Sequence, residues 1–441
     1  MRKAYEEYKA TGIQWLPQIP RHWEYKKINS LFLERKTKVS DKDYQPLSVT
    51  KSGILHQLAD AAKSNDSDNR KLVLTGDFVI NSRSDRKGSC GVSALDGSVS
   101  LINIVLEPKR KLEQLFVHYL LRCQPFSEEY YRCGRGIVAD LWTTRYSEMK
   151  SIYLPVPPRE EQEQIVRFLG WKISSINKLI NLKQQEIFEL KQSFSSFLTK
   201  ELTGLSNTTN IPLKRIFSVP MTDGPHETPK LEETGIPFVS AESAHDGRIN
   251  LKDCRGYISV EQHKAFCKKV KPQRDDIFIV KSGSTTGKTV IVDFDEEFSI
   301  WSPLALIRCN DLAIPKYIFY FCTSELFQKQ VRDKWSFGTQ PNIGMNVLRD
   351  LRVLLPSIVD QNSFVLATDK YWKTVQDLIK LIEQQITNLH DLKSSLIADV
   401  VTGQIDVRDV EIPNYEQVEE TLYKSDDNDT LQSEDEIPEE V

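Results

Sequence analysis

The chain has 441 residues, of which 39% are hydrophobic and 27% charged, and its formal net charge is −4. That length favours two or three domains with separate cores, and seven scattered cysteines without a Cys-x-x-Cys pair argue against a disulfide framework or a structural zinc site. No stretch approaches the roughly 18 apolar residues of a membrane helix, and no apolar signal segment follows Met1, so we expect a cytoplasmic protein.

The first half opens with a short lead-in, residues 1–22, in which prolines exclude a regular helix. A globular domain of mixed strands and helices is expected over 23–158, because short apolar runs alternate there with glycine, asparagine, aspartate and serine. We predict strands near 77–80 and 101–106 and a helix near 114–122.

A long heptad helix is predicted over 159–204. Acidic residues at its start suit the positive end of the helix dipole, and apolar residues then recur at steps of four and three. The residues expected to pair this helix with another helix are Ile173, Ile176, Ile180, Ile187 and Leu190.

The second half repeats this order, with a second globular domain at 211–356 and a second long helix at 360–403. Shifted by 199 residues, the first helix matches the second in its apolar seam and at identical positions such as Leu179 and Leu378. A seam of this length needs a partner helix, and the chain itself supplies one. We therefore predict an α+β fold with an internal repeat, in which two divergent heads share one helical scaffold. The second set of pairing residues is Trp372, Val375, Ile379, Ile386 and Leu389.

An acidic tail ends the sequence. Residues 411–441 hold twelve acidic residues and one lysine, so the rest of the chain carries a net charge of about +7. This composition predicts a disordered tail, either without a role or kept away from nucleic acid, whereas the basic body suits contact with nucleic acid.

Two loops combine the residue types that contact DNA. Arginine pairs with guanine or phosphate, hydroxyl side chains reach base edges or phosphate oxygens, and glycine allows close approach of the backbone. A solvated surface hairpin is the alternative interpretation of each loop. The candidates in the first head are Arg70, Lys71, Arg83, Ser84, Arg86 and Lys87. Those in the second head are Lys281, Ser282, Ser284, Thr285 and Lys288, with Gln340 and Asn342 as side chains suited to adenine.

Catalytic and cofactor motifs are not found. Gly283 and Gly287 enclose three residues where a nucleotide-binding P-loop has four, and a strand is predicted after this loop in place of a helix. The nearest set for a metal-dependent nuclease is Asp77 with Asp85 and Lys87. No motif of an adenine methyltransferase is present, and the histidines lack metal-ligand spacing. We expect a chain that holds no metal or cofactor and no catalytic residue.

Several motifs resemble those of the DNA specificity subunit of Type I restriction-modification systems, and together they cover the chain to about residue 408. The most specific are the proline-terminated segment leading into Glu-Glu-Gln at 154–162, the Leu-Thr-Gly at 202–204, and the Val-Thr-Gly-Gln-Ile-Asp-Val at 401–407. Further motifs lie at 12–20, 223–229 (Asp-Gly-Pro-His-Glu-Thr-Pro), 235–240 and 281–288.

This resemblance implies that each head is a target recognition domain that reads one half of a split site in double-stranded DNA. It implies two long helices packed antiparallel as a spacer that docks methyltransferase subunits, in a complex that also holds restriction-translocase subunits. S-adenosylmethionine, ATP and Mg²⁺ would then be used by those partners, and this chain would be non-catalytic. The alternatives are a stand-alone nuclease or methyltransferase, and a coiled-coil adaptor that binds no DNA.

Overall fold

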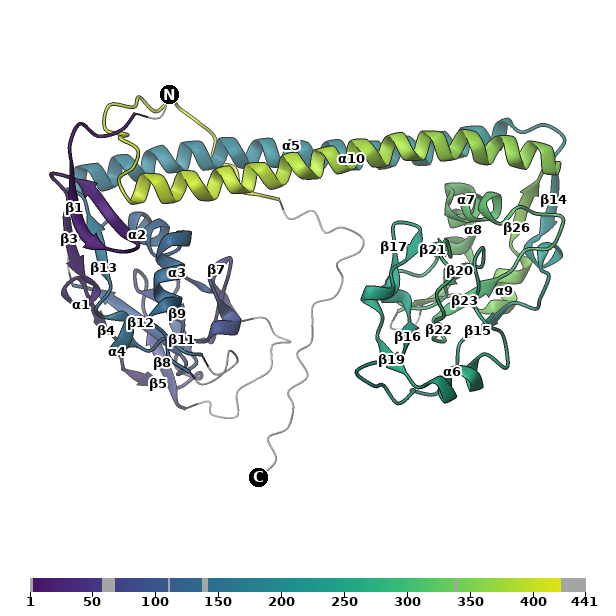
Figure 1. Cartoon of the computed structure of the whole chain (residues 1–441), viewed down its shortest axis with the longest axis horizontal. Coiled ribbons are helices and arrows are strands. Elements are labelled where there is room, and N and C mark those ends of the chain that lie inside the picture. Colours follow the sequence, from purple (N-terminus) through teal and green to yellow (C-terminus); the bar gives the residue numbers. More distant parts are fainter. Residues whose placement is uncertain (1–2, 58–67, 110–111, 137–141, 338–339, 422–441) are drawn as a thin grey trace. The chain divides into compact units, whose positions relative to one another are not determined.

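The computed structural model describes residues 3–57, 68–109, 112–136, 142–337 and 340–421. The chain forms two compact units: unit 1 contains Met1–Leu182 with Gln384–Thr421, and unit 2 contains Lys183–Glu383 among the described residues. Both boundaries lie inside long helices, so each unit has a globular head and one half of each long helix (Figure 1). Over the described part of the chain, no helix is both long and apolar enough to cross a membrane.

The head of unit 1 is built on a four-stranded sheet in the order β10-β9-β12-β4. These strands are β4 (Phe32–Glu34), β9 (Phe78–Asn81), β10 (Cys90–Val92) and β12 (Asn103–Pro108). β3 (Glu24–Lys27) pairs with β13 (Tyr153–Val156), which joins the start of the head to its end. The remaining elements are β1 (Tyr8–Ile13), β2 (Leu16–Pro20), α1 (Ile28–Leu31), β5 (Lys38–Val39), β6 (Leu47–Thr50), β7 (Gly53–His56), β8 (Arg70–Val73), β11 (Gly97–Val99), α2 (Gln114–Leu120), α3 (Gln124–Arg132), α4 (Tyr146–Met149) and a 3₁₀ turn at Ser84–Arg86.

The head of unit 2 is built on a six-stranded sheet in the order β15-β23-β20-β21-β18-β17. These strands are β15 (Thr222–Asp223), β17 (Ala244–His245), β18 (Arg248–Ile249), β20 (Ile277–Val280), β21 (Thr289–Ile291) and β23 (Leu304–Ile307). β14 (Thr209–Pro212) pairs with β26 (Arg352–Leu355), again joining the start of the head to its end. The remaining elements are β16 (Ile236–Val239), β19 (Gly256–Ile258), α6 (Val260–Phe266), β22 (Ser299–Ile300), α7 (Pro315–Thr323), α8 (Glu325–Lys334), β24 (Ser336–Phe337), β25 (Pro341–Asn342), α9 (Met345–Asp350) and 3₁₀ turns at Leu213–Ile216, Ala241–Ser243 and Leu251–Asp253.

The central strand of each head is buried on both faces. In β20, Ile277 and Ile279 belong to one apolar cluster, whereas Phe278 and Val280 belong to another. Successive side chains of a strand point to opposite faces, so a strand between two cores must be apolar at every position. This is why 277–280, and likewise Phe78–Ile80 in β9, appear in the sequence as unbroken apolar runs.

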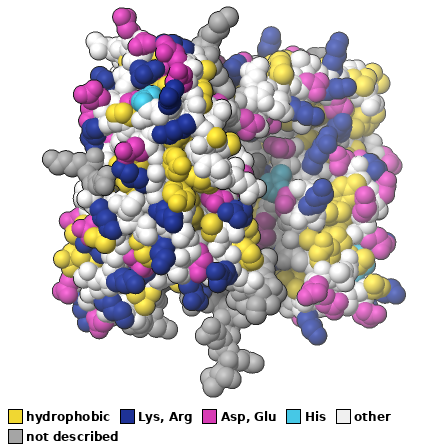
Figure 2. Space-filling view, turned by 60° about the vertical axis from the view of Figure 1, so that its left-hand side comes forward, with side chains coloured by type: hydrophobic (Ala, Val, Ile, Leu, Met, Phe, Trp, Pro, Cys, Tyr) yellow, Lys and Arg dark blue, Asp and Glu magenta, His cyan; other side chains and the backbone are white. Residues whose placement is uncertain are grey.

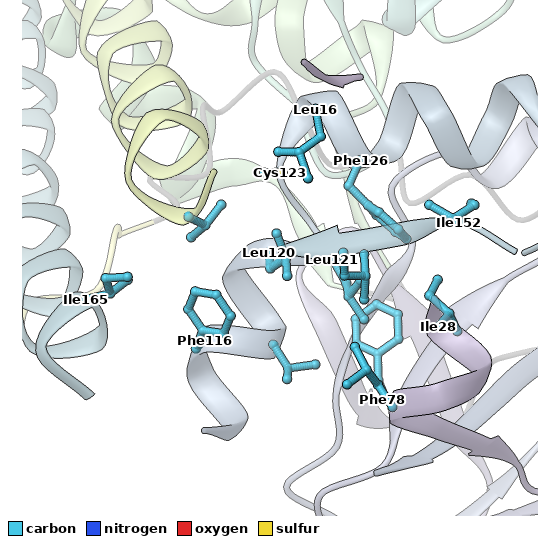
Figure 3. Packing of buried hydrophobic residues seen from close by; sticks show 14 of the residues in the cluster. Leu16, Ile28, Phe78, Phe116, Leu120, Leu121, Cys123, Phe126, Ile152 and Ile165 are labelled. Carbon is cyan, nitrogen blue, oxygen red and sulfur yellow. The ribbon is translucent and has the colours of Figure 1, made fainter. Parts of the chain in front are cut away.

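The main core of unit 1 joins its head to the ends of the long helices. Phe116 of α2 belongs to the same buried cluster as Ile165, and Figure 3 shows the two side chains on neighbouring elements. Val400 and Val401, both fully buried, complete the cluster from the other long helix. Because the cluster draws on all of these elements, the head and the adjacent helix ends form one folded piece.

The two long helices are α5 (Arg159–Gly204) and α10 (Ile358–Val401). In unit 2, the ring of Phe194 lies 4.3 Å from that of Trp372, and the ring of Phe197 lies 4.4 Å from that of Tyr371. Residue numbers rise along α5 as they fall along α10, so the helices are antiparallel. All ten residues predicted to line the seam are buried or half-buried, and Ile176, Ile180 and Val375 are among the buried ones. The α+β fold with a helix pair is thus confirmed.

The internal repeat extends from the helices into the heads. The sheet order β4-β12-β9-β10 in unit 1 matches β15-β23-β20-β21 in unit 2. Several backbone hydrogen bonds also recur at the spacing of 199 residues, although few of the side chains agree. These pairs of bonds run from Asn81 to Ser89 and Val280 to Lys288, from Ser93 to Asp77 and Val292 to Asp276, and from Thr144 to Ser82 and Ile343 to Lys281.

The C-terminal strap, residues 411–421, follows α5 in unit 1. The side-chain amides of Asn177 and Asn181 donate to the carbonyls of Val418 and Glu419 at 2.8 and 3.0 Å, and Lys393 Nζ of α10 lies 3.1 Å from Glu420 Oε2. The prediction of disorder from residue 411 onward is therefore wrong for the strap, because side chains on α5 satisfy its backbone. Residues 422–441 of the predicted tail lie outside the described residues.

The start of the chain also meets the segment that follows α10. The backbone amide of Asp406 donates to the carbonyl of Lys3 at 2.8 Å, and Lys3 Nζ lies 2.6 Å from Asp409 Oδ2. Gly403, whose φ of 77° favours glycine, turns the chain out of α10 beside Pro20 and Trp23. The lead-in therefore packs against the segment that follows α10, and these contacts join the start of unit 1 to its second stretch of chain.

Candidate nucleic-acid interface

The first-head loop, Asn81–Ser89, connects β9 to β10 and carries most of the predicted DNA-binding residues of unit 1. A backbone bond of 3.0 Å from Asn81 to Ser89 closes it, and the Asn81 side chain accepts a second bond from Arg83 N. Arg83, Arg86 and Lys87 are exposed. The loop thus presents three cations on a backbone that is fixed from within. The side chain of Ser84, also predicted to bind DNA, lies outside the described residues.

The segment Trp142–Thr144 lies beside this loop. Thr144 N donates to Ser82 O at 2.9 Å, and Thr143 forms an isolated bridge with Arg83. Lys87 Nζ lies 5.1 Å from the ring centroid of Tyr131, a distance at which a cation is attracted to the face of a ring. The loop is therefore supported by the neighbouring segment and by an aromatic side chain.

The second-head loop, Lys281–Lys288, occupies the equivalent position between β20 and β21. Gly287 has a φ of 96°, and a Cβ atom there would lie 2.7 Å from Gln328 Oε1, so the turn requires glycine. Ser284 is exposed at its tip, whereas Lys281, Ser282, Thr285 and Lys288 are half-buried.

Gln340 and Asn342 lie beside the second-head loop, although more than 50 residues separate them from it in the sequence. Gly283 N donates to Pro341 O at 3.1 Å, and Ser282 forms an isolated bridge with Asn342. This bridge is the counterpart of the one between Arg83 and Thr143, at the same spacing of 199. Gln340 and Asn342 are both exposed, so the structure brings these two predicted sets of the second head together.

Arg70 is not available to DNA, and its prediction as a contact is wrong. Its side chain is buried, and its guanidinium donates to the Ser98 hydroxyl at 2.8 Å and to the Ser98 carbonyl at 3.1 Å. Burial lowers the pKa of Arg70 from its ordinary value. Its role is to hold β8 in the sheet β11-β8-β5.

Two predicted lysines are held inside their heads. Lys71 Nζ donates to the carbonyl of Asn103 at 2.7 Å, and burial lowers the pKa of Lys71. Lys281 Nζ lies 3.0 Å from the carboxylate of Asp223. With side chains only 15% and 16% exposed, these lysines are poor candidates for reading bases at the surface.

Sequence reasoning did not identify Asp223 as part of this region. Asp223 is buried at the edge strand β15, where it also bonds Lys269 Nζ at 2.9 Å. Burial by itself would raise the pKa of Asp223, but the bonds from Lys269 and Lys281 hold that pKa below its ordinary value. The only signal in the sequence is the segment Asp223–Pro229, which the family resemblance marks without giving its role.

The sets that suggest an enzyme do not assemble. β21 follows the second-head loop directly, where a P-loop would be followed by a helix. Asp77 is buried and bonded to Arg35 Nε at 2.8 Å, whereas Asp85 and Lys87 are exposed. Among the described residues, no group of three or more His, Cys, Asp or Glu side chains is arranged to hold a metal ion.

On the face seen in Figure 2, positive charge is spread out. Figure 2 shows lysine and arginine side chains across the face in view, mixed with acidic and hydrophobic ones, and no large block of a single sign.

Comparison with known proteins gives the same picture. The chain matches the family Type I restriction modification DNA specificity domain twice, over residues 20–192 and 206–389. It is 24% identical over 341 residues to the Type I restriction enzyme MjaVIII specificity subunit of Methanocaldococcus jannaschii, covering 71% of this chain and 76% of that protein. A putative MjaX specificity subunit from the same organism is 20% identical and covers 91% of this chain and 97% of its own length.

The fold is also similar to a solved structure. A chain from a study of complex assembly and conformational transition of the type I restriction-modification system superimposes with a TM-score of 0.58 at 16% identity, covering 88% of this chain and 99% of that chain. The two family matches coincide with the two heads and the helices that follow them. The chain therefore belongs to the Type I restriction-modification DNA specificity family and is a non-catalytic subunit that recognises DNA.

Proposed function

We propose that this subunit recognises a split double-stranded DNA target, with one head on each half-site, and directs partner methyltransferase and restriction-translocase subunits to it. The observation that carries the proposal is the pair of loops held by equivalent backbone bonds but carrying different side chains. Exposed cations dominate the first-head loop, whereas the second-head loop exposes the hydroxyl of Ser284 beside the amides of Gln340 and Asn342. One shared backbone arrangement that carries two different sets of DNA-contacting side chains suits two different half-sites.

The test is a comparison of two loop variants. One replaces Arg83, Arg86 and Lys87 by Ala, and the other replaces Ser284, Gln340 and Asn342 by Ala. Each should lose discrimination at one half-site only, by about 1–3 kcal/mol per base-reading side chain. The measurement is affinity for DNA sites mutated in either half, after the target has been identified by mapping methylated adenines in the host genome.

The matched control is Lys214→Ala, which removes an exposed lysine that pairs with Asp350 outside both loops. It should leave discrimination at both half-sites unchanged. Variants of both loops that keep the affinity and sequence preference of the parent protein would show that the heads read DNA with another face.

The methyltransferase partners fit best on leucines that the helix pair leaves exposed. Leu179 and Leu182 of α5 are 49% and 57% exposed, and their counterparts 199 residues later, Leu378 and Leu381, are 43% and 56% exposed. Solvent-facing leucines repeated in both units suit two copies of one partner, because each unit then offers the same apolar contact. S-adenosylmethionine, ATP and Mg²⁺ belong in this proposal to the partner subunits, and the assembled complex would act on DNA in the cytoplasm.

A further inference from the structure

Each head contains a carboxylate with two lysines at the same place in its sheet. In unit 2, buried Asp223 on β15 bonds Lys269 at 2.9 Å and lies 3.0 Å from Lys281. In unit 1, Glu34 on β4 lies 3.2 Å from Lys36 and 3.8 Å from Lys71. β4 and β15 are equivalent strands, because each borders the strand next to the central one. We call these the two carboxylate–dilysine groups.

The groups share a pattern of exposure. The inner lysines, Lys71 and Lys281, are 15% and 16% exposed, whereas the outer lysines, Lys36 and Lys269, are 76% and 58% exposed. One carboxylate balances only one of the two ammonium charges. Each group therefore keeps about one unit of positive charge near the surface, where an anion would neutralise it.

A hollow lies beside each group and adds a further cationic or imidazole side chain. The hollow of unit 1 has a volume of about 340 Å³ and is lined by Glu34, Lys71 and exposed Arg145. The hollow of unit 2 has a volume of about 230 Å³ and is lined by Asp223, Lys269 and His226, whose Nε2 lies 3.2 Å from Asp223.

Glycine keeps the hollow of unit 2 in shape. The hollow is lined by Asp223, Pro225 and His226, and Gly224 lies between the first two in the sequence. A Cβ atom on Gly224 would lie 2.1 Å from the carbonyl oxygen of Ile300, so no other residue fits there without movement of the backbone. The turn that carries the acid and the imidazole is thus fixed against its neighbouring strand.

The hollow of unit 1 borders the first-head loop, and the hollow of unit 2 is linked to the second-head loop through Asp223. Ser82 of the first-head loop lines the hollow of unit 1, and Lys281, 199 residues later, begins the second-head loop while its Nζ bonds Asp223. An anion in the hollow of unit 1 would therefore lie at the base of the first-head loop, and one in the hollow of unit 2 would lie beside the carboxylate that holds the first residue of the second-head loop. The anion expected there is a phosphate of the DNA backbone, because phosphate contacts orient a protein whose neighbouring side chains read bases.

We propose that each carboxylate–dilysine group is a phosphate site that seats one backbone phosphate of the bound DNA in its hollow. The carboxylate fixes the inner lysine, while the outer lysine or Arg145 and the remaining N–H donors meet the phosphate. This rests on the proposed function, since it assumes that the loops face DNA.

The test uses Lys269→Ala for unit 2 and Arg145→Ala for unit 1 in the full chain, with Lys269→Arg and Arg145→Lys as charge-retaining controls. Each alanine variant should lower the slope of log affinity against log salt concentration by about 0.9, because one fewer counterion-releasing contact is made. Between about 50 and about 200 mM salt, this equals roughly a 3.5-fold smaller loss of affinity. The effect should be equal on intact sites and on sites mutated in either half, and the controls should keep the parent slope.

Circular dichroism and thermal unfolding establish that the variants are folded. Parent protein that shows no salt-sensitive DNA binding would overturn the proposed function itself. A parent that binds DNA, with folded alanine variants that keep its slope, would overturn only the phosphate sites. An alanine variant that loses affinity for only one half-site sequence would also overturn the phosphate sites. If inorganic phosphate at matched ionic strength binds the parent but not Lys269→Ala while their DNA slopes agree, the hollow takes free phosphate and this proposal is wrong.

Discussion

At the scale of single residues, the position of a cation in the fold decides its role. Arg83, Arg86 and Lys87 could be predicted as surface cations because they lie in a short segment rich in glycine and serine. Arg70 and Lys281 could not be classified in this way. Their partners, Ser98 and Asp223, lie 28 and 58 positions away in the sequence and meet them only when the sheets form. Residue type alone therefore identifies the loops but does not separate exposed cations from buried ones.

Arg70→Ala tests this distinction. The substitution removes a buried guanidinium and leaves the Ser98 carbonyl without its charged donor, so we expect the free energy of unfolding of unit 1 to fall by about 2–3 kcal/mol. Arg86→Ala, at a side chain 46% exposed, should change it by less than about 0.5 kcal/mol. Urea unfolding, monitored by hydrogen exchange in β8, measures the free energy of unfolding of both variants. Equal stability of the two variants would contradict the structural role of Arg70.

At the scale of elements, the long helices were the most predictable part of the fold and the strap the least. A heptad pattern over many turns is a local signal, and α5 has the bounds 159–204 that the pattern indicates. The strap has no periodicity, and what orders it is a set of amide side chains on α5 more than 230 positions away. Its acidic composition resembles that of a disordered segment. Composition therefore gives the wrong prediction here, because contacts distant in sequence decide the structure of the strap.

Two truncations test the strap. Ending the chain after Val410 removes the bonds that the strap makes with Asn177 and Asn181 and the ion pair of Lys393 with Glu420, so unit 1 should lose about 1–3 kcal/mol of stability. Ending it after Thr421 keeps every one of these contacts and serves as the control. Hydrogen exchange in the unit 1 parts of α5 and α10 should rise in the first truncation only. Equal exchange in both would show that the strap adds nothing to the helix pair.

At the scale of the whole molecule, a sequence repeat that is strong in the helices becomes a repeat of backbone bonds in the heads. The sequence predicts two heads because both helices carry the same seam. It does not predict that equivalent bonds close the first-head and second-head loops, since few side chains agree there and backbone bonds leave no signature in residue type. A duplicated frame whose loops vary freely suits the split target proposed for this subunit.

The repeat predicts equal effects of paired helix substitutions on partner binding. Replacing Leu179 and Leu182 by Glu should remove one methyltransferase copy from the complex, and replacing Leu378 and Leu381 should remove the other, because charge at each exposed pair prevents apolar contact. Native mass spectrometry with the methyltransferase subunit of the same system gives the stoichiometry. The control is Leu115→Glu, at a residue of α2 that is 50% exposed. Two bound copies in both helix variants would place the partner elsewhere.

The meeting of Lys3 with Asp406 and Asp409 has a consequence for biosynthesis. Among the described residues, unit 2 is the single continuous stretch Lys183–Glu383, whereas unit 1 needs Gln384–Thr421, made later, to finish its core. Until then Phe116 and Ile165 lack the buried valines at 400 and 401. The head that is synthesised first is therefore the last to complete its core. Nascent chains that stall before α10 is complete expose an apolar surface, which chaperones can bind and through which the chains can aggregate.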